Sequence, residues 1–395
     1  MNILYIDYQM YGKEDMIEAF MGLGHNVYST DVPVLYEDDR DKLTELLYED
    51  MSGSGCEIAF TSNYHPEVSE LAEKLGMKYI SWTYDSPLIT LYHPSILNEC
   101  NYVFIFDSEE VRQLKARGVK HVYYMPLGIN PERIDAITIS KEDEDTFSSD
   151  VSLVASLYNE EHNLYDRMSD RLDEHTRGYL EGVMNAQANM YGANIIDEVL
   201  SQNAEIVAKM YKAMPYTLDK GSLAGLPYVY ANYFLCRKVA NIQRIQFIKE
   251  ISKRFDMKVY TPGDVSDIET VKAMGTVDYK TDMNKVFMLS KINLNITLPS
   301  IHTGIPLRAM DIMGAGGFLL SNWQRDFDGL FENGTDYSAY TGLDEALYLI
   351  DYYLSHNDER CAIADTAKQK MRDGFDVIMH IHQMMEIVED KGDKV

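Results

Sequence analysis

The sequence predicts two α/β domains in tandem, each an open parallel sheet covered by helices, with a largely helical insert in the second half. Short apolar runs alternate with stretches of helical spacing in two separate parts of the chain, and such alternation favours parallel sheets. The chain has 395 residues, which exceeds the size at which one hydrophobic core stops growing. Its content of 46% hydrophobic and 25% charged residues is typical of a globular protein.

We place the N-terminal domain at residues 1–145. Apolar runs predict strands at residues 2–7, 25–28, 58–61, 79–83, 102–107 and 122–126. Helical spacing predicts helices between them at residues 13–23, 66–75 and 109–117. Gly24 suits the end of the first helix, because glycine adopts positive φ without steric cost. The alternation implies a parallel sheet with both faces covered.

The domain junction is predicted where the pattern dissolves, between residues 130 and 150. This stretch contains the acidic segment 141–145, which we interpret as a solvated linker. The C-terminal domain then spans residues 146–375, and residues 376–395 form a C-terminal helix that could pack back on the N-terminal domain.

The C-terminal domain restarts the alternation after the junction. Strands are predicted at residues 151–157, 258–261, 276–279, 292–297 and 318–321, and helices at 282–290, 308–314, 344–355 and 358–388, the last bent at Gly374. Residues 162–255 have mostly helical spacing, with breaks near Pro215 and at 218–227. They form the predicted insert.

Charge and composition exclude several classes of function. Lys and Arg number 36 against 63 Asp and Glu, and the net charge of −27 would repel a nucleic-acid backbone. No apolar run approaches the ~20 residues that span a bilayer, and the N-terminus lacks a signal-peptide pattern, so we expect a cytoplasmic protein. The cysteines show neither metal-ligand nor CxxC spacing and are expected to be reduced: Cys56, Cys100, Cys236 and Cys361.

Residues 298–321 are the most informative stretch. A predicted strand ends at Thr297, a loop of small residues follows, and a helix begins near Leu307. Loop amides and the positive end of that helix make a natural diphosphate site. Asp311 could accept hydrogen bonds from ribose hydroxyls, and Arg308 lies three residues earlier. The alternative is that Arg308 and Asp311 merely pair on a solvent-exposed helix face.

This stretch resembles the donor-binding signature of GT-B glycosyltransferases, in which a Glu-x7-Glu pattern follows a Pro-Ser pair. Here the pattern falls on Thr303 and Asp311, and Arg308 is more typical of a branch that resembles the spore-maturation CgeB-like transferases. Residues 79–87, 101–107, 122–128 and 150–158 are similar to further segments of that family. The resemblance implies two Rossmann-like domains facing a cleft, the GT-B arrangement, with the helical insert in the C-terminal half.

The resemblance also implies an activity. It is the transfer of a sugar from a nucleoside-diphosphate sugar, with UDP or another base, to a hydroxyl-bearing acceptor such as a protein, a surface glycan or a small molecule. It implies no metal and no cofactor beyond this co-substrate, and no Asp-x-Asp motif stands after a strand. The acceptor would be bound by the N-terminal domain and the donor by the C-terminal one.

The resemblance implies a set of donor-binding residues in the C-terminal domain. Asp311 would bind ribose, the Thr303 and Gly304 amides with Arg308 would bind the diphosphate, and Tyr279 would flank the base. The remaining candidates are His302, Ser156 and Asn159. Many such transferases carry an Arg and a Lys after the first strand of this domain, whereas residues 158–162 here offer none. Arg308, loop amides and His302 are therefore expected to meet the phosphate charge.

Two residues of the N-terminal domain are candidates for the general base. Asp85 follows the carboxyl end of a predicted strand and could accept a proton from an acceptor hydroxyl, or it could cap the turn before Pro87. His65 also follows a strand and could face the sugar, or it could be structural. Because the first Glu of the family pattern is missing, retention and inversion both stay open.

Two rival interpretations remain. A GT-B sugar-nucleotide epimerase would act on the donor alone and would need no acceptor pocket. A nucleotide-sugar-binding protein without turnover would fit the Thr at position 303 and the missing basic pair.

Overall fold

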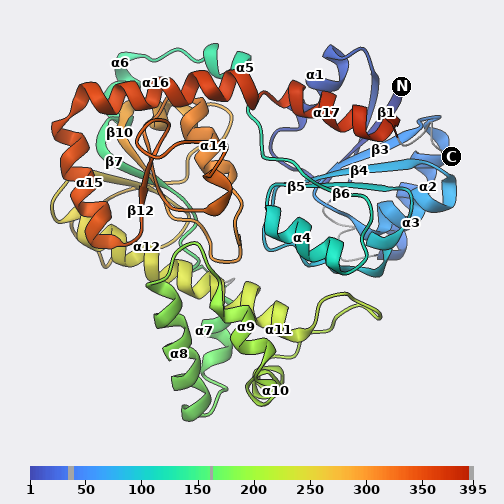
Figure 1. Ribbon diagram of the computed structural model, residues 1–395, viewed down its shortest axis with the longest axis horizontal. Coiled ribbons are helices and arrows are strands. Elements are labelled where there is room, and N and C mark those ends of the chain that lie inside the picture. Colours follow the sequence, from blue (N-terminus) through green and yellow to red (C-terminus); the bar gives the residue numbers. More distant parts are fainter. Residues whose placement is uncertain (34–39, 161–162, 391–395) are drawn as a thin grey trace. The chain divides into compact units, whose positions relative to one another are not determined.

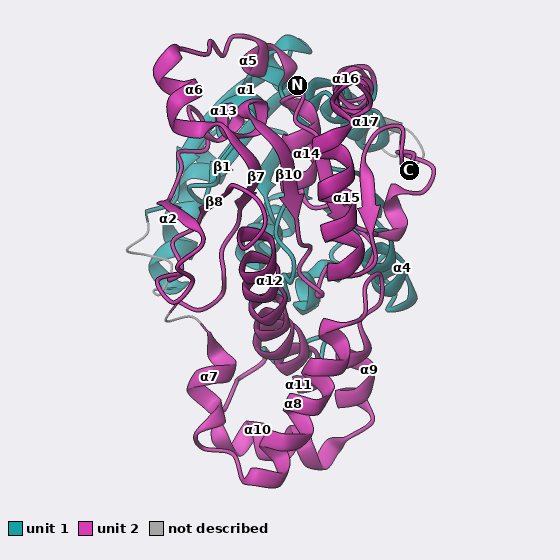
Figure 2. Cartoon of the chain, turned by 90° about the vertical axis from the view of Figure 1, so that its left-hand side faces the viewer, with its two compact units in different colours: residues 1–130, 219–224, 374–395 teal, residues 131–218, 225–373 magenta. Residues whose placement is uncertain are grey.

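The computed structural model describes residues 1–33, 40–160 and 163–390 (Figure 1). The chain forms two compact units, shown in separate colours in Figure 2. Unit 1 comprises residues 1–130, 219–224 and 374–395, and unit 2 comprises residues 131–218 and 225–373. Each unit, in its described part, holds one six-stranded sheet.

The sheet of unit 1 has the strand order β2-β1-β3-β4-β5-β6, and every pair is parallel. Its strands are β1 (Asn2–Asp7), β2 (Asn26–Asp31), β3 (Ile58–Ser62), β4 (Lys78–Thr83), β5 (Asn101–Ile105) and β6 (Val122–Tyr124). Every residue of β3 and β5 is buried, as expected for strands covered on both faces. All carboxyl ends therefore meet at one edge of the sheet.

Helices cover this sheet. They are α1 (Lys13–Gly22), α2 (Arg40–Gly53), α3 (Pro66–Leu75), α4 (Ser108–Ala116) and, from the end of the chain, α17 (Val377–Asp390). Helix α3 starts with proline in its first turn and ends at Gly76, whose φ of 68° is the left-handed conformation that glycine adopts freely.

Unit 1 includes two segments that are distant in sequence from its sheet. The Leu223 amide donates to the Tyr92 carbonyl at 2.8 Å. The amides of Ile129 and Val377 donate to the carbonyls of Phe375 and Ile129, both at 2.9 Å. Helix α17 then packs against α1. The end of the chain is thus an integral part of the first unit.

The sheet of unit 2 has the order β12-β11-β10-β7-β8-β9 and is also parallel throughout. Its strands are β7 (Ser149–Val154), β8 (Met257–Tyr260), β9 (Lys272–Gly275), β10 (Ser290–Asn295), β11 (Leu319–Asn322) and β12 (Ser338–Tyr340). Its helices outside the insert are α5 (Pro131–Asp135), α6 (Lys141–Phe147), α13 (Met283–Leu289), α14 (Leu307–Gly314), α15 (Leu343–Ser355) and α16 (Asn357–Gly374). Fully buried Val151, Ile292 and Leu320 belong to the apolar core around the central strands.

The insert is helical, as the sequence predicts. It contains α7 (Leu164–Ser169), α8 (Glu174–Ala188), α9 (Ile195–Ser201), α10 (Ala204–Ala213) and α11 (Leu226–Val229), gathered at one end of the long helix α12 (Cys236–Ser252) (Figures 1 and 2). The first four begin at Asn163, Asp173, Asn194 and Asn203, whose side chains each accept a backbone amide. Residues Tyr230–Leu235, just before α12, form a π-helix.

Several elements differ from the sequence prediction. The strand predicted at residues 276–279 is wrong: β9 ends at Gly275, and Asp278 instead closes a turn on the amides of Lys280 and Thr281. The acidic segment 141–145 lies within helix α6, because Ser140 and Asp143 form a reciprocal capping box. The final predicted helix, residues 358–388, is two helices, α16 and α17, that separate at Gly374.

No helix within residues 1–33, 40–160 and 163–390 combines the length and the apolar character that crossing a membrane requires.

Candidate functional site

The candidate donor residues lie at the carboxyl edge of the unit 2 sheet. Ser156 and Asn159 follow β7, Tyr279 follows β9, and the remaining five lie between β10 and β11: His302, Thr303, Gly304, Arg308 and Asp311. Parallel strands bring these loops to one edge, which is where open α/β sheets bind ligands.

Arg308, Asp311 and Tyr279 form a cluster at the first turns of α14. The Arg308 Nη1 lies 3.4 Å from Asp311 Oδ2, and the Tyr279 hydroxyl donates to Asp311 Oδ1 at 3.4 Å. Arg308 also contacts the Met283 sulfur and the face of the Phe287 ring. Asp311 is only 6% exposed. The expected alternative of a pair on a solvent-exposed face is therefore wrong, because α14 buries this carboxylate.

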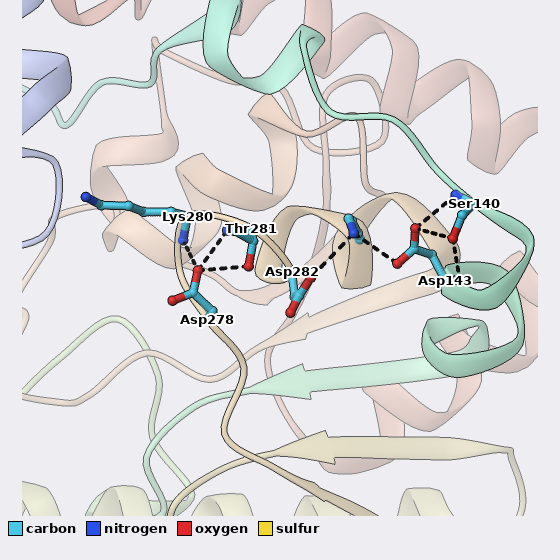
Figure 3. A network of polar contacts seen from close by, with 7 residues as sticks. Ser140, Asp143, Asp278, Lys280, Thr281 and Asp282 are labelled. Atoms are coloured by element: carbon cyan, nitrogen blue, oxygen red, sulfur yellow. Dashed lines mark hydrogen bonds and ion pairs between the residues drawn. The ribbon is translucent and has the colours of Figure 1, made fainter.

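A second network fixes the turn that carries Tyr279 (Figure 3). The Asp278 carboxylate accepts hydrogen bonds from the Lys280 amide, the Thr281 amide and the Thr281 hydroxyl at 2.9–3.0 Å. These bonds, the Thr281 amide first, lower the pKa of Asp278. Nearby, Lys285 bridges Asp143 and Asp282 at 2.9 and 3.4 Å and so ties α13 to α6. Tyr279 thus extends from a braced turn.

The loop from β10 to α14 is held by the last residue of β11 and by residues that follow this strand. The Asn322 side-chain oxygen accepts from the Thr297 amide at 2.7 Å, and the Gln324 side chain donates to the Ile301 carbonyl at 3.2 Å. Thr303 is buried, and its carbonyl accepts from the Asp326 amide at 3.0 Å. Gly304 is buried and His302 half-buried. Hydrogen bonds within the protein therefore hold this loop in its conformation without a ligand.

Ser156 and Asn159 stabilise the loop after β7. The Ser156 hydroxyl donates to the Glu160 carboxylate at 2.9 Å, and the Asn159 side chain donates to the Asp264 carbonyl at 2.7 Å. A Cβ at Gly263 would lie 2.4 Å from the Asn159 side-chain oxygen and 2.9 Å from the Leu157 Cβ, so a side chain here would force the loop to shift. The side chains of Ser156 and Asn159 therefore stabilise the loop after β7 through these hydrogen bonds.

In unit 1, Asp85 lies just beyond β4 and is exposed. Its carboxylate accepts from the Asn63 side chain at 2.7 Å. The Asn63 side-chain oxygen accepts from the amides of Tyr84 and Asp85, at 2.9 and 3.1 Å. Asn63 therefore caps this turn, and the Asp85 carboxylate is held in place by Asn63. Sequence reasoning missed Asn63, because one more polar residue after a strand carries no distinguishing signal.

His65, at the start of α3, stacks on Tyr8 with ring centroids 3.4 Å apart. Its Nδ1 lies 3.6 Å from Glu67 Oε1, which also accepts the Tyr8 hydroxyl at 2.7 Å. Burial raises the pKa of Glu67, but the contacts with His65 and Tyr8 outweigh it and hold that pKa at about 2. The His65 Nε2 is buried without a hydrogen-bond partner among the described residues. Asp85 and His65 thus lie at the same edge of the sheet, but Asp85 is exposed whereas the His65 Nε2 is buried.

Comparison with known proteins gives a family match over part of the chain. A family model described as "Glycosyl transferase-like" matches residues 241–386. The match contains β8 to β12, the loop after β10, and α14 with Arg308 and Asp311. No curated protein sequence matches the chain.

Solved structures resemble the chain over its whole length. HepE of Anabaena, in complex with UDP-glucose, has a TM-score of 0.55 at 10% identity, covering 99% of this chain and 100% of that one. Sucrose-phosphate synthase of Thermosynechococcus elongatus has a TM-score of 0.56 at 8% identity, with the same coverage. A glycosyltransferase of Rickettsia africae has a TM-score of 0.54 at 11% identity, covering 100% of this chain and 99% of that one.

The chain has the GT-B fold. Its two parallel six-stranded sheets with surrounding helices are the two Rossmann-like domains of that fold. The sequence-based fold class is thereby confirmed, and the candidate donor residues occupy the second GT-B domain.

Within this GT-B domain, two arginines of α12 were missed by sequence reasoning. Arg244 is buried, and its guanidinium donates to the carbonyls of Ser156 and Ile296, which follow β7 and β10. Its guanidinium carbon lies 5.1 Å from the centre of the Tyr158 ring, and that of Arg237 lies 6.0 Å from it. Helical spacing in the insert predicts a helix here, but it does not show which side chains reach the loop after β7.

A pocket of mixed polar and apolar lining lies between the insert and the loop after β10. Its empty space of about 260 Å³ is partly open to solvent, and it is lined by Gln187, Met190, Tyr191, Gly192, Ala193, Gln243, Thr297, Leu298, Pro299, Ile301, Asn322 and Gln324. A Cβ at Gly192 would lie 2.5 Å from the Trp323 ring. The insert therefore contributes part of the wall beside the predicted donor loop.

Proposed function

We propose that the chain transfers a sugar from a nucleoside-diphosphate sugar to a hydroxyl-bearing acceptor. The observation that carries this proposal is the cluster of Arg308, Asp311 and Tyr279 at the start of α14, in a chain with the GT-B fold. The family match across this cluster supports it, as do the solved HepE complexes with UDP and UDP-glucose. The position of Arg308 favours the branch that resembles CgeB-like transferases.

In the proposal, unit 2 binds the donor. Asp311 accepts hydrogen bonds from the ribose, and Tyr279, whose hydroxyl already contacts Asp311, flanks the base. Arg308 and the amides of Thr303 and Gly304 bind the diphosphate. Positive groups fixed in advance stabilise the charge that develops on the leaving diphosphate, which is usually the largest contribution to such catalysis. For this reason we propose that no divalent ion is needed.

Unit 1 binds the acceptor, and Asp85 is the proposed general base. Its carboxylate is exposed, so an acceptor hydroxyl can reach it, and the hydrogen bond from Asn63 fixes its orientation. His65 is the second candidate. Glu67 can hold its Nδ1–H, which would leave Nε2 as the basic atom, but that atom is covered.

The test combines donor binding with turnover. A nucleotide sugar that binds the native state raises the melting temperature by mass action, and a panel of such sugars identifies the donor. With donor and acceptor, we expect release of nucleoside diphosphate that persists in excess chelator. Asp85→Asn is expected to lower the rate roughly 10²-fold or more with little change in melting temperature. His65→Gln is the matched variant on the same edge.

Each of the following results would contradict a different part of this proposal. Donor binding without turnover would support a binding protein, and conversion of the donor alone to an isomer would support an epimerase. Loss of turnover in His65→Gln but not in Asp85→Asn would move the base to His65. Activity lost with chelator and restored by Mg²⁺ or Mn²⁺ would contradict the metal-free mechanism.

A further inference from the structure

Arg237 lies at the start of α12, and its guanidinium contacts aromatic rings rather than a carboxylate. Its guanidinium carbon lies 5.1 Å from the centre of the Tyr233 ring and 6.0 Å from that of Tyr158. Its Nε is buried without a hydrogen-bond partner, and Arg237 makes no ion pair in the part of the chain that the structure describes. The next residue, Lys238, is instead paired with Asp166 at 2.8 Å.

The Tyr158 ring connects Arg237 to the ends of the strands. Tyr158 belongs to the loop after β7 and has a φ of 55°, an unusual conformation for a tyrosine. Arg244 contacts the same ring and binds the carbonyls of Ser156 and Ile296. Arg237 is thereby placed at the edge of the sheet from which the loop toward α14 departs.

Local backbone geometry also sets Arg237 apart. The π-helix Tyr230–Leu235 ends just before α12. A π-helical segment changes the direction in which the following residues point, and such segments are frequent at functional sites. In the nearby loop, Glu160 uses its Oε1 to accept from the Ser156 hydroxyl and the Leu157 amide, at 2.9 and 3.3 Å, so this oxygen is already hydrogen-bonded within the loop.

We propose that Arg237, which lies over the rings of Tyr233 and Tyr158, binds the diphosphate of the donor and replaces the basic residues that the loop after β7 lacks. The planar fork of an arginine matches two phosphate oxygens, and an adjacent aromatic ring holds its orientation. The helical insert thus delivers a donor-binding residue to the GT-B domain. This inference rests on the proposed function.

The experiment is calorimetric titration of the whole chain with UDP, ADP and GDP, followed by the monophosphate of the nucleoside that binds best. Arg237→Gln is expected to weaken binding of the diphosphate roughly 10- to 100-fold and that of the monophosphate less than about 3-fold. Lys238→Gln, on the neighbouring residue, is the matched control and is expected to bind both as the wild type does. Arg237→Lys keeps the charge and is expected to lose affinity about 3- to 10-fold.

The outcomes separate the inference from the function on which it rests. Wild-type protein that binds none of the three diphosphates would contradict the proposed function itself. Wild-type binding that Arg237→Gln leaves unchanged would overturn only the inference, as would equal losses for the diphosphate and the monophosphate. If Arg237→Gln does not fold, Arg237→Lys provides the test, and an unchanged affinity of that variant for the diphosphate would overturn the inference.

Discussion

Among the residues that the structure describes, three other than glycine have positive φ, and each follows the carboxyl end of a strand. Gln9 follows β1, Asn63 follows β3 and Tyr158 follows β7, with φ of 60°, 64° and 55°. Such conformations cost on the order of 1 kcal/mol or more for residues with a Cβ, and they persist where the surroundings hold them. Asn63 holds Asp85, and Tyr158 contacts Arg237. Backbone strain thus coincides with the proposed site residues in both units.

The carboxylate of Asp311 provides a prediction at the residue scale. Removing it in Asp311→Ala should weaken donor binding by about 1–3 kcal/mol, since ribose hydroxyls and Tyr279 lose their acceptor. Titration of the folded variant with the best nucleotide sugar measures this. Asp267→Ala, which removes an exposed carboxylate, is the control. An unchanged affinity in folded Asp311→Ala would remove this residue from the site.

The sequence predicted some of these residues for a definite reason. Arg308 and Asp311 lie in a continuous strand–loop–helix segment, so their spacing in the sequence is enough to suggest a binding site. Asn63, Arg237 and Arg244 act through contacts across 21 to 88 residues, such as Arg244 with Ser156. No local pattern encodes such contacts. The donor and base assignments themselves stay predictions until binding and turnover are measured.

Two glycines provide a prediction at the scale of single elements. A Cβ at Gly317, between α14 and β11, would lie 2.7 Å from the Phe287 carbonyl oxygen and 2.6 Å from the Asn293 side-chain nitrogen. Gly317→Ala should destabilise unit 2 by about 1–3 kcal/mol. Gly178, exposed within α8, has no atom within 4 Å of such a Cβ, so Gly178→Ala should stabilise by about 0.5–1 kcal/mol.

Urea unfolding monitored by far-UV circular dichroism measures both changes. The two variants make the same chemical substitution. The opposite signs are expected because the methyl group overpacks the site at Gly317, whereas at Gly178 it meets no neighbour and lowers the backbone entropy of the unfolded chain. Equal midpoints for wild type and Gly317→Ala would show that the junction between α14 and β11 relaxes to accept a methyl group.

Helices and strands were easiest to predict where burial determines the order of apolar and polar residues. The apolar runs of β3, β5 and β10 were found from sequence, because strands covered on both faces leave little choice of residue. The short exposed strand β9 was misplaced, since its residues are mostly exposed and a side-chain turn at Asp278 follows. Helix α6 was missed because five charged residues obscure its capping box.

At the scale of the whole molecule, His380 links the end of the chain to unit 1. It is 2% exposed and contacts the rings of Trp82 and Phe375. Burial lowers the pKa of His380 to about 4. Because the folded state disfavours the charged imidazole, stability is fully present above the unfolded pKa of about 6.5 and falls as the pH drops toward 4. The predicted loss is on the order of 2–3 kcal/mol.

The melting temperature of His380→Leu should therefore fall less than that of the wild type when the pH is lowered from about 7.5 to about 5. Leucine is apolar and cannot be protonated, so the variant lacks the destabilisation that protonation of His380 causes and keeps the pH dependence of all other groups. His382→Leu on the exposed side of the same helix is the control and should follow the wild type. Parallel melting curves for all three proteins would contradict a role for His380 in acid sensitivity.

Unit 1 is assembled from three separate stretches of the chain, and the last of them is residues 374–395. During synthesis the six strands of its sheet leave the ribosome long before α17 does. Until α17 has been synthesised, the surface of α1 beside Gly22, against which the Ile378 side chain packs, is not covered by that helix. The first unit to be made is thus the last to be completed, and a nascent chain stopped before residue 374 would leave the α1 side of that contact without its partner helix.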